Sequence, residues 1–273
     1  MMLEPFPRYV NYAEPKRRFT WMNDYDSNEK IVIFGDSFAS SDGDFDFKEN
    51  EIEHNNKSWY GVLHHRTQKQ IWNYGNGGTS LQYSKQQLFS YLNSEYYNED
   101  DYIIFITTSF TRVPTFPIGD DRYKPRWQSQ LLSFVTDGLD DRDTDSYNLF
   151  KRHKKELEWL SYTLSKEDFV NELRMLQVFL NSLPNKTLLI PAFKYHEADK
   201  FLNIKKFCLH EVSEREPINE SLYLNDVHPR ILGNDPRKQH LSDRNNEILA
   251  VKIDNYFKNG NIKTFSMEGF EFE

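Results

Sequence analysis

The sequence has little cysteine and no long apolar run, and both absences restrict the kind of protein it encodes. Its single cysteine, Cys208, excludes a disulfide within the chain and suits a reducing compartment such as the cytoplasm. The longest strongly apolar runs, IVIF and IIFI, have four residues each, whereas a membrane-spanning helix needs about 20. The first ten residues, MMLEPFPRYV, lack the apolar stretch of a signal peptide. We therefore expect a soluble, cytoplasmic protein with neither an export signal nor a membrane partner.

An excess of positive charge is also missing. The chain carries 34 Lys and Arg residues against 42 Asp and Glu, which leaves a net charge of −8. Phosphate backbones repel such an acidic chain. A basic run at 151–155 is followed directly by Glu156 and Glu158, as on the solvated face of a helix. We therefore expect no nucleic-acid partner.

The common sequence patterns for metals and phosphate-containing cofactors are absent too. The chain has 8 histidines but neither an H-E-x-x-H nor a C-x-x-C pattern. The glycines around residues 75–78 fit neither G-x-G-x-x-G nor G-x-x-x-x-G-K-[ST], the patterns of dinucleotide- and nucleotide-binding loops. We therefore expect no metal and no cofactor.

The sequence does contain enough apolar and aromatic residues for a sizeable core, including 21 Phe and 16 Tyr. Short apolar runs typical of buried strands lie at 30–34, 70–74, 101–107, 187–190 and, more weakly, 205–212. Helical spacing of apolar residues is found at 81–92, 148–161, 166–183 and from Ser242 onward. This alternation predicts an α/β fold, a three-layer sandwich with a mostly parallel five-stranded sheet and helices on both faces.

We expect one such domain over residues 30–273. Residues 1–29, rich in proline, aromatic and charged residues, are predicted to form an arm on its surface. Residues 113–147 contain several prolines and many Asp and Arg residues, and they are predicted to form an inserted loop or cap.

Two segments that contain candidate catalytic groups directly follow predicted strands. The carboxyl ends of the strands are where ligands bind in parallel sheets. In Gly35-Asp36-Ser37, the hydroxyl of Ser37 is suited to an exposed position on a tight turn, and its N–H to binding an oxyanion. The same tripeptide also fits a plain turn in which Ser37 only caps a helix. The second segment, NYGNGGTS at 73–80, has glycines that let backbone N–H groups approach a substrate, or that serve only the geometry of a turn.

A third segment, at 234–242, places His240 immediately before the last predicted helix. From there an imidazole can reach the ends of the strands, although a histidine at such a position is often only a surface residue.

Together the three segments resemble the SGNH/GDSL hydrolase family, over roughly residues 30–257. IVIFGDSFAS resembles its first block, NYGNGGTS its second, and HLSDRNNEILA its histidine and last helix. The resemblance implies a flavodoxin-like SGNH hydrolase fold in which Ser37 is the nucleophile and His240 the general base. It also implies that the N–H groups of Ser37 and Gly78 form the oxyanion hole, without a metal or cofactor.

The third block departs from the family pattern, which has an Asn whose side chain completes the oxyanion hole. Here the third strand ends in TTSFTR, without an Asn. Either Ser109, Thr111 or Arg112 replaces it, or the hole has only two donors, and loss of one such donor typically lowers turnover by about 10²–10³-fold.

The fourth block departs as well, because the family has an Asp three residues before the histidine and this chain has Arg237 there. Asp235 is the nearest upstream carboxylate, and in the implied triad it orients the His240 imidazole. Asp226 and His228 form an alternative carboxylate and imidazole pair.

The implied reaction is acyl transfer through a Ser-bound intermediate. The expected function is a serine esterase acting on a small or carbohydrate-linked ester, such as an O-acetyl group. An O-acyltransferase uses the same chemistry, and a weakly active or inactive binding or structural protein uses the same fold. The TSFTR and DPRKQH segments are similar to bacteriophage-encoded members, so a virion-associated protein is included among these alternatives. The sequence leaves the oligomeric state open.

Overall fold

The computed structural model describes residues 17–18, 29–36, 38–39, 58–75, 80–108, 166–213 and 241–271. The strands are β1 (Arg17–Arg18), β2 (Lys30–Phe34), β3 (Gln70–Asn73), β4 (Tyr102–Ile106) and β5 (Lys186–Ile190). The helices are α2 (Trp59–Thr67), α3 (Leu81–Leu92), α6 (Lys166–Ser182) and α7 (Asp243–Asn259), with short 3-10 turns η2 (Ala198–Lys200), η3 (Leu209–Val212) and η6 (Ile262–Thr264).

Within the described ranges, the sheet contains four parallel strands in the order β3-β2-β4-β5, and the two-residue strand β1 pairs antiparallel with β3 at its edge. Strand β2 is central and buried along its whole length. Its alternate residues Ile31 and Ile33 belong to one core cluster, and Val32 and Phe34 belong to the other. Burial on both faces explains why this strand is continuously apolar.

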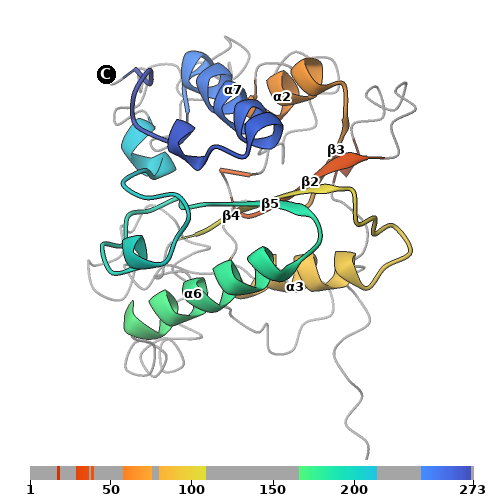
Figure 1. Ribbon diagram of the computed structural model, residues 1–273, viewed down its shortest axis with the longest axis horizontal. Coiled ribbons are helices and arrows are strands. Elements are labelled where there is room, and N and C mark those ends of the chain that lie inside the picture. The colour runs from red at the N-terminus through yellow and green to blue at the C-terminus, as the bar shows by residue number, and fades with distance from the viewer. Residues whose placement is uncertain are drawn as a thin grey trace, which may run out of the picture.

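Helices α2 and α7 cover one face of the sheet, and α3 and α6 cover the other (Figure 1). Each pair encloses one of the two core clusters. The helix predicted from Ser242 onward is capped by that serine, which accepts from the Asn245 N–H at 3.2 Å, and Ser80 caps α3 by accepting from the Tyr83 N–H at 3.3 Å. Among the described helices, none has the length and apolar character needed to cross a bilayer.

The predicted fifth strand at 205–212 is wrong. Its last residues form the 3-10 turn η3, and the Leu209 and His210 N–H groups donate to the carbonyls of Pro191 and Ala192 at 3.0 and 2.9 Å. These acceptors lie beyond the end of β5, so the segment crosses the loop after the strand and does not extend the sheet. Its apolar residues are buried all the same, which is why a short apolar run resembled a strand.

Helix α2 was not among the predicted elements. Its sequence WYGVLHHRT has no clear apolar stripe, because residues around most of its circumference are buried between the sheet and α7. The predicted helix at 148–161, the cap at 113–147 and, apart from β1 and Glu29, the arm at 1–29 lie outside the described residues.

Candidate functional site

The site residues predicted from the sequence lie outside the described part of the chain. They are Ser37, Gly78, Ser109, Thr111, Arg112, Asp226, His228, Asp235 and His240. The structure does describe the residues beside several of them. Asp36 and Phe38 flank Ser37, Thr108 directly precedes Ser109, and Leu241 directly follows His240.

Asp36 organises the turn that follows β2. Its side chain is completely buried, and its Oδ1 accepts from the Phe38 N–H at 3.1 Å. The Asp36 carbonyl accepts from the Ala39 N–H at 3.0 Å, which closes a turn over residues 36–39. An Asp side chain that accepts from the N–H two residues further on commonly stabilises such a turn. We call this segment the 36–39 turn.

The second oxygen of Asp36 joins the 36–39 turn to the end of β4, because Oδ2 accepts from the Thr108 hydroxyl at 2.9 Å. Both carboxylate oxygens of Asp36 are therefore engaged in a buried site. This aspartate holds the two loops together and is not an exposed acid or base.

Asn73, the last residue of β3, joins the same turn to the glycine-rich loop. Its Nδ2 donates to the Ala39 carbonyl at 2.7 Å, and its Oδ1 accepts from the Gly75 N–H at 2.8 Å. The ends of β3, β2 and β4 are thus linked side by side through one set of residues, which we call the strand-end cluster. Its members are Asp36, Ala39, Asn73, Gly75 and Thr108.

The strand-end cluster lies at the point of the sheet where successive strands are added on opposite sides of β2. From β2 the chain moves to one neighbour, β3, through α2, and β4 then lies on the opposite side of β2 after α3. Because α2 and α3 cover opposite faces (Figure 1), a crevice at the carboxyl ends of β2 and β4 is the usual place for a ligand in such a sheet.

Two glycines allow the loops of the strand-end cluster to approach this closely. Gly35 has φ +150°, and a Cβ there would lie 2.8 Å from the Ile106 carbonyl oxygen. A Cβ on Gly75 would lie 2.7 Å from the Cβ of Ala39. Both distances are shorter than real carbon contacts, so only glycine fits without moving the backbone.

We predict that Gly75→Ala will lower the free energy of unfolding by about 1–3 kcal/mol, since the added methyl overpacks the contact with Ala39. Urea denaturation measures this change. Gly260→Ala is the control, because its added Cβ meets nothing within 4 Å and only its φ of +65° resists the substitution. Gly75→Ala should also slow any reaction at the 36–39 turn, whereas Gly260→Ala should not. A Gly75→Ala protein as stable and as reactive as the wild type would contradict the close approach.

The linking roles of Asp36, Asn73 and Thr108 were not predicted from the sequence. Their position could have indicated them, since each is a polar residue at the end of a buried apolar strand.

His210 was not predicted as a site residue either. Its ring lies 5.2 Å from that of Phe193, which in turn lies 6.1 Å from the ring of Phe38. A described imidazole is therefore present at this end of the sheet, on the loop after β5.

Other chemistries have less support in the described part of the chain. Burial raises the pKa of the Cys208 thiol to about 11, which leaves little thiolate to act as a nucleophile at neutral pH. Within the ranges given above, no group of His, Cys, Asp and Glu residues is arranged to hold a metal ion.

No protein-family model matches this chain, and no curated protein or solved structure matches it significantly. Support for a function therefore comes from the sequence motifs and from the geometry of the strand-end cluster.

Proposed function

We propose that the protein is a serine-dependent ester hydrolase with a flavodoxin-like SGNH hydrolase fold, in which Ser37 is the nucleophile. The observation that carries this proposal is the buried Asp36, which fixes the turn after β2 and binds Thr108 at the end of β4. In the sequence, Ser37 directly follows that aspartate.

The order of the parallel strands supports the same proposal. Numbered along the chain, the parallel strands are arranged 2-1-3-4. This matches the first part of the flavodoxin-like order 2-1-3-4-5, whose ligands bind between strands 1 and 3. In this protein those strands are β2 and β4, the two that Asp36 and Thr108 connect.

In the proposed reaction, the Ser37 hydroxyl attacks the carbonyl carbon of an ester while His240 takes its proton. The negative oxygen that forms is held by the N–H groups of Ser37 and Gly78, with a third donor from Ser109, Thr111 or Arg112. The alcohol leaves with the proton from His240, and water then releases the acid from Ser37. Asp235 orients the imidazole and stabilises its charged form.

The proposed substrate is a small or carbohydrate-linked ester such as an O-acetyl group. A sugar hydroxyl in place of water would make the same intermediate an acyl donor, so the O-acyltransferase remains the alternative with the same nucleophile. The other alternative is a binding or structural protein, including a virion-associated one, in which Ser37 is inert.

A fluorophosphonate probe tests the proposal without knowledge of the substrate, since it reacts preferentially with activated serine hydroxyls. We expect the native protein to gain one probe mass, and peptide mapping to place it on Ser37. Protein unfolded in urea should remain unlabelled, which controls for unspecific reaction. If the native protein is not labelled, or is labelled at another residue, Ser37 is not an activated nucleophile and the binding protein is favoured.

A further inference from the structure

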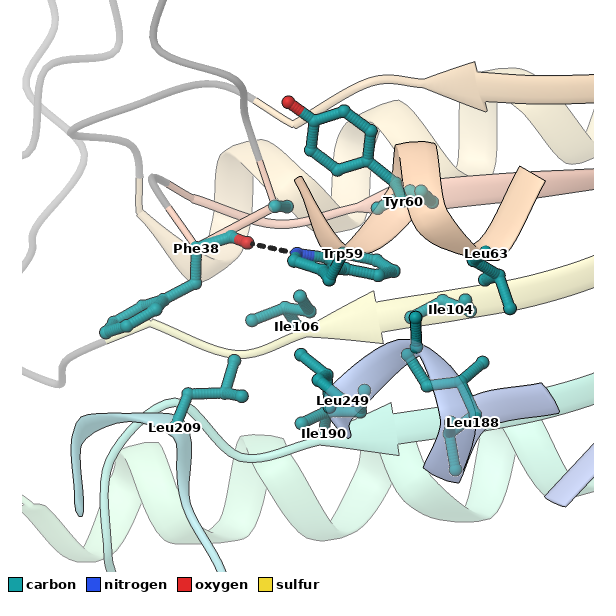
Figure 2. Close-up of a cluster of buried hydrophobic side chains, with 14 of the residues drawn as sticks. Phe38, Trp59, Tyr60, Leu63, Ile104, Ile106, Leu188, Ile190, Leu209 and Leu249 are labelled. Atoms are coloured by element: carbon teal, nitrogen blue, oxygen red, sulfur yellow. Dashed lines mark hydrogen bonds between the residues drawn. The ribbon is translucent and has the colours of Figure 1, made fainter. Parts of the chain in front are cut away.

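A short path of hydrogen bonds connects the segment of Ser37 with the segment of His240. The indole N–H of Trp59 donates to the Phe38 carbonyl at 3.0 Å (Figure 2), and the backbone N–H of Trp59 donates to Oδ1 of Asn246 at 3.1 Å. The Nδ2 of Asn246 then donates to the Leu241 carbonyl at 3.3 Å. Phe38 and Leu241 are the residues that directly follow Ser37 and His240.

Three of the four residues on the path are packed in the core. Trp59, Phe38 and Leu241 are all buried members of one core cluster. Trp59 is the first residue of α2, where a backbone N–H has no partner within the helix, and Asn246 in the first turn of α7 supplies one. The contact between α2 and α7 is therefore also a contact between the two chain segments of the proposed site.

We propose that Trp59 and Asn246 are positioning residues, which set the spacing of the Ser37 and His240 segments through the Phe38 and Leu241 carbonyls. This inference rests on the proposed function. A serine and its base must come within about 2.6–3.2 Å of each other, and these two residues are far apart in the sequence. A misplacement of about 1 Å is enough to cost roughly 10²-fold in rate, so a fixed frame between the two segments is required.

Three substitutions cut the path, each at a different set of bonds. Trp59→Phe removes the indole N–H and keeps the backbone bond to Asn246. Asn246→Ala removes the bonds to Trp59 and Leu241, while Asn246→Asp keeps an acceptor for Trp59 and loses only the donor to Leu241. The last variant serves where Asn246→Ala does not fold.

The neighbouring Asn245 gives a matched control. Its Nδ2 donates to the carbonyls of Val212 and Glu271, both at 2.9 Å, and its Oδ1 accepts from the Glu271 N–H at 2.9 Å. Asn245→Ala therefore loses at least as many hydrogen bonds from the same helix turn, but none that leads to Phe38 or Leu241.

The measurements are the rate of fluorophosphonate labelling at Ser37, and kcat and KM for p-nitrophenyl acetate, well below the melting temperature of each variant. For Trp59→Phe and Asn246→Ala we expect labelling and kcat to fall by roughly 10- to 100-fold with little change in KM. The double variant should be no slower than the slower single variant, because both substitutions interrupt one path. Asn245→Ala should stay within about 2-fold of the wild type, even where its stability is reduced.

The outcomes separate the two proposals. If wild-type Ser37 is not labelled, the proposed function fails and the positioning role fails with it. If Ser37 is labelled equally fast in the wild type, Trp59→Phe and the Asn246 variants, only the positioning role is overturned. The same holds if Asn245→Ala is slowed as much as Asn246→Ala, since the effect then follows from general destabilisation of α7.

Discussion

Ser37→Ala is expected to lower the turnover of p-nitrophenyl acetate by roughly 10³-fold or more, because the variant has no hydroxyl with which to form the acyl intermediate. The melting temperature should stay within the error of the wild type, since the carboxylate of Asp36 and the Phe38 and Ala39 N–H groups that hold the turn are unchanged. Turnover of the purified variant beside the wild type gives the answer. Equal rates in both proteins would show that the hydrolysis does not use Ser37.

Histidine variants then identify the base. His240→Ala should lose about as much turnover as Ser37→Ala, because members of a triad act as a unit. His228→Ala tests the alternative pair with Asp226, and His210→Ala tests the imidazole beside Phe193; both should remain close to the wild type. A loss confined to His228→Ala or to His210→Ala would move the base to that residue while leaving Ser37 as the nucleophile.

Asp101→Ala is expected to lower the free energy of unfolding by about 3–5 kcal/mol, the usual cost of removing one partner from a buried ion pair. Asp101 is completely buried, and its Oδ2 lies 2.6 Å from the Nζ of Lys30. Its Oδ1 accepts from the Lys30 N–H at 3.0 Å, and Oδ2 also accepts from the Tyr91 hydroxyl. Burial, together with this hydrogen bond to the Asp101 carboxylate, raises the pKa of Tyr91, so the phenol stays neutral.

Urea denaturation measures how much unfolding free energy Asp101→Ala loses. Glu211→Ala is the control, because its bond to Lys194 at 2.9 Å is exposed and screened by water, so its loss should change the free energy of unfolding far less. Replacing both partners, as Lys30→Met with Asp101→Leu, should recover part of the stability, since no unpaired ammonium then remains buried. A single Asp101→Ala variant that loses no more than Glu211→Ala would contradict a stabilising role for the pair.

The Lys30–Asp101 pair lies at the opposite end of β2 from the proposed site. Lys30 begins β2, whereas the 36–39 turn follows its last residue. We therefore expect an Asp101 variant that still folds to react with the fluorophosphonate probe at nearly the wild-type rate. Stability and activity should respond to opposite ends of the same strand.

Elements with a regular pattern of burial were predictable from the sequence alone. The apolar run of β2 predicted a strand covered on both faces, and Ser242 predicted the start of α7. Prediction from the sequence failed where burial and secondary structure do not coincide. The 205–212 segment is apolar because it is buried, yet its N–H groups bind the loop after β5, and α2 has no apolar stripe because it is buried around most of its surface.

The loops of the candidate site are held together by contacts between residues that are distant in the sequence. The G-D-S motif predicted a role for the serine. The role of Asp36 follows from its hydrogen bond with Thr108, which lies 72 positions further along the chain. The bonds from Asn73 to Ala39 and from Trp59 to Asn246 join segments 34 and 187 positions apart. Such pairs leave no local pattern, because each polar group needs a partner only once packing has removed it from water.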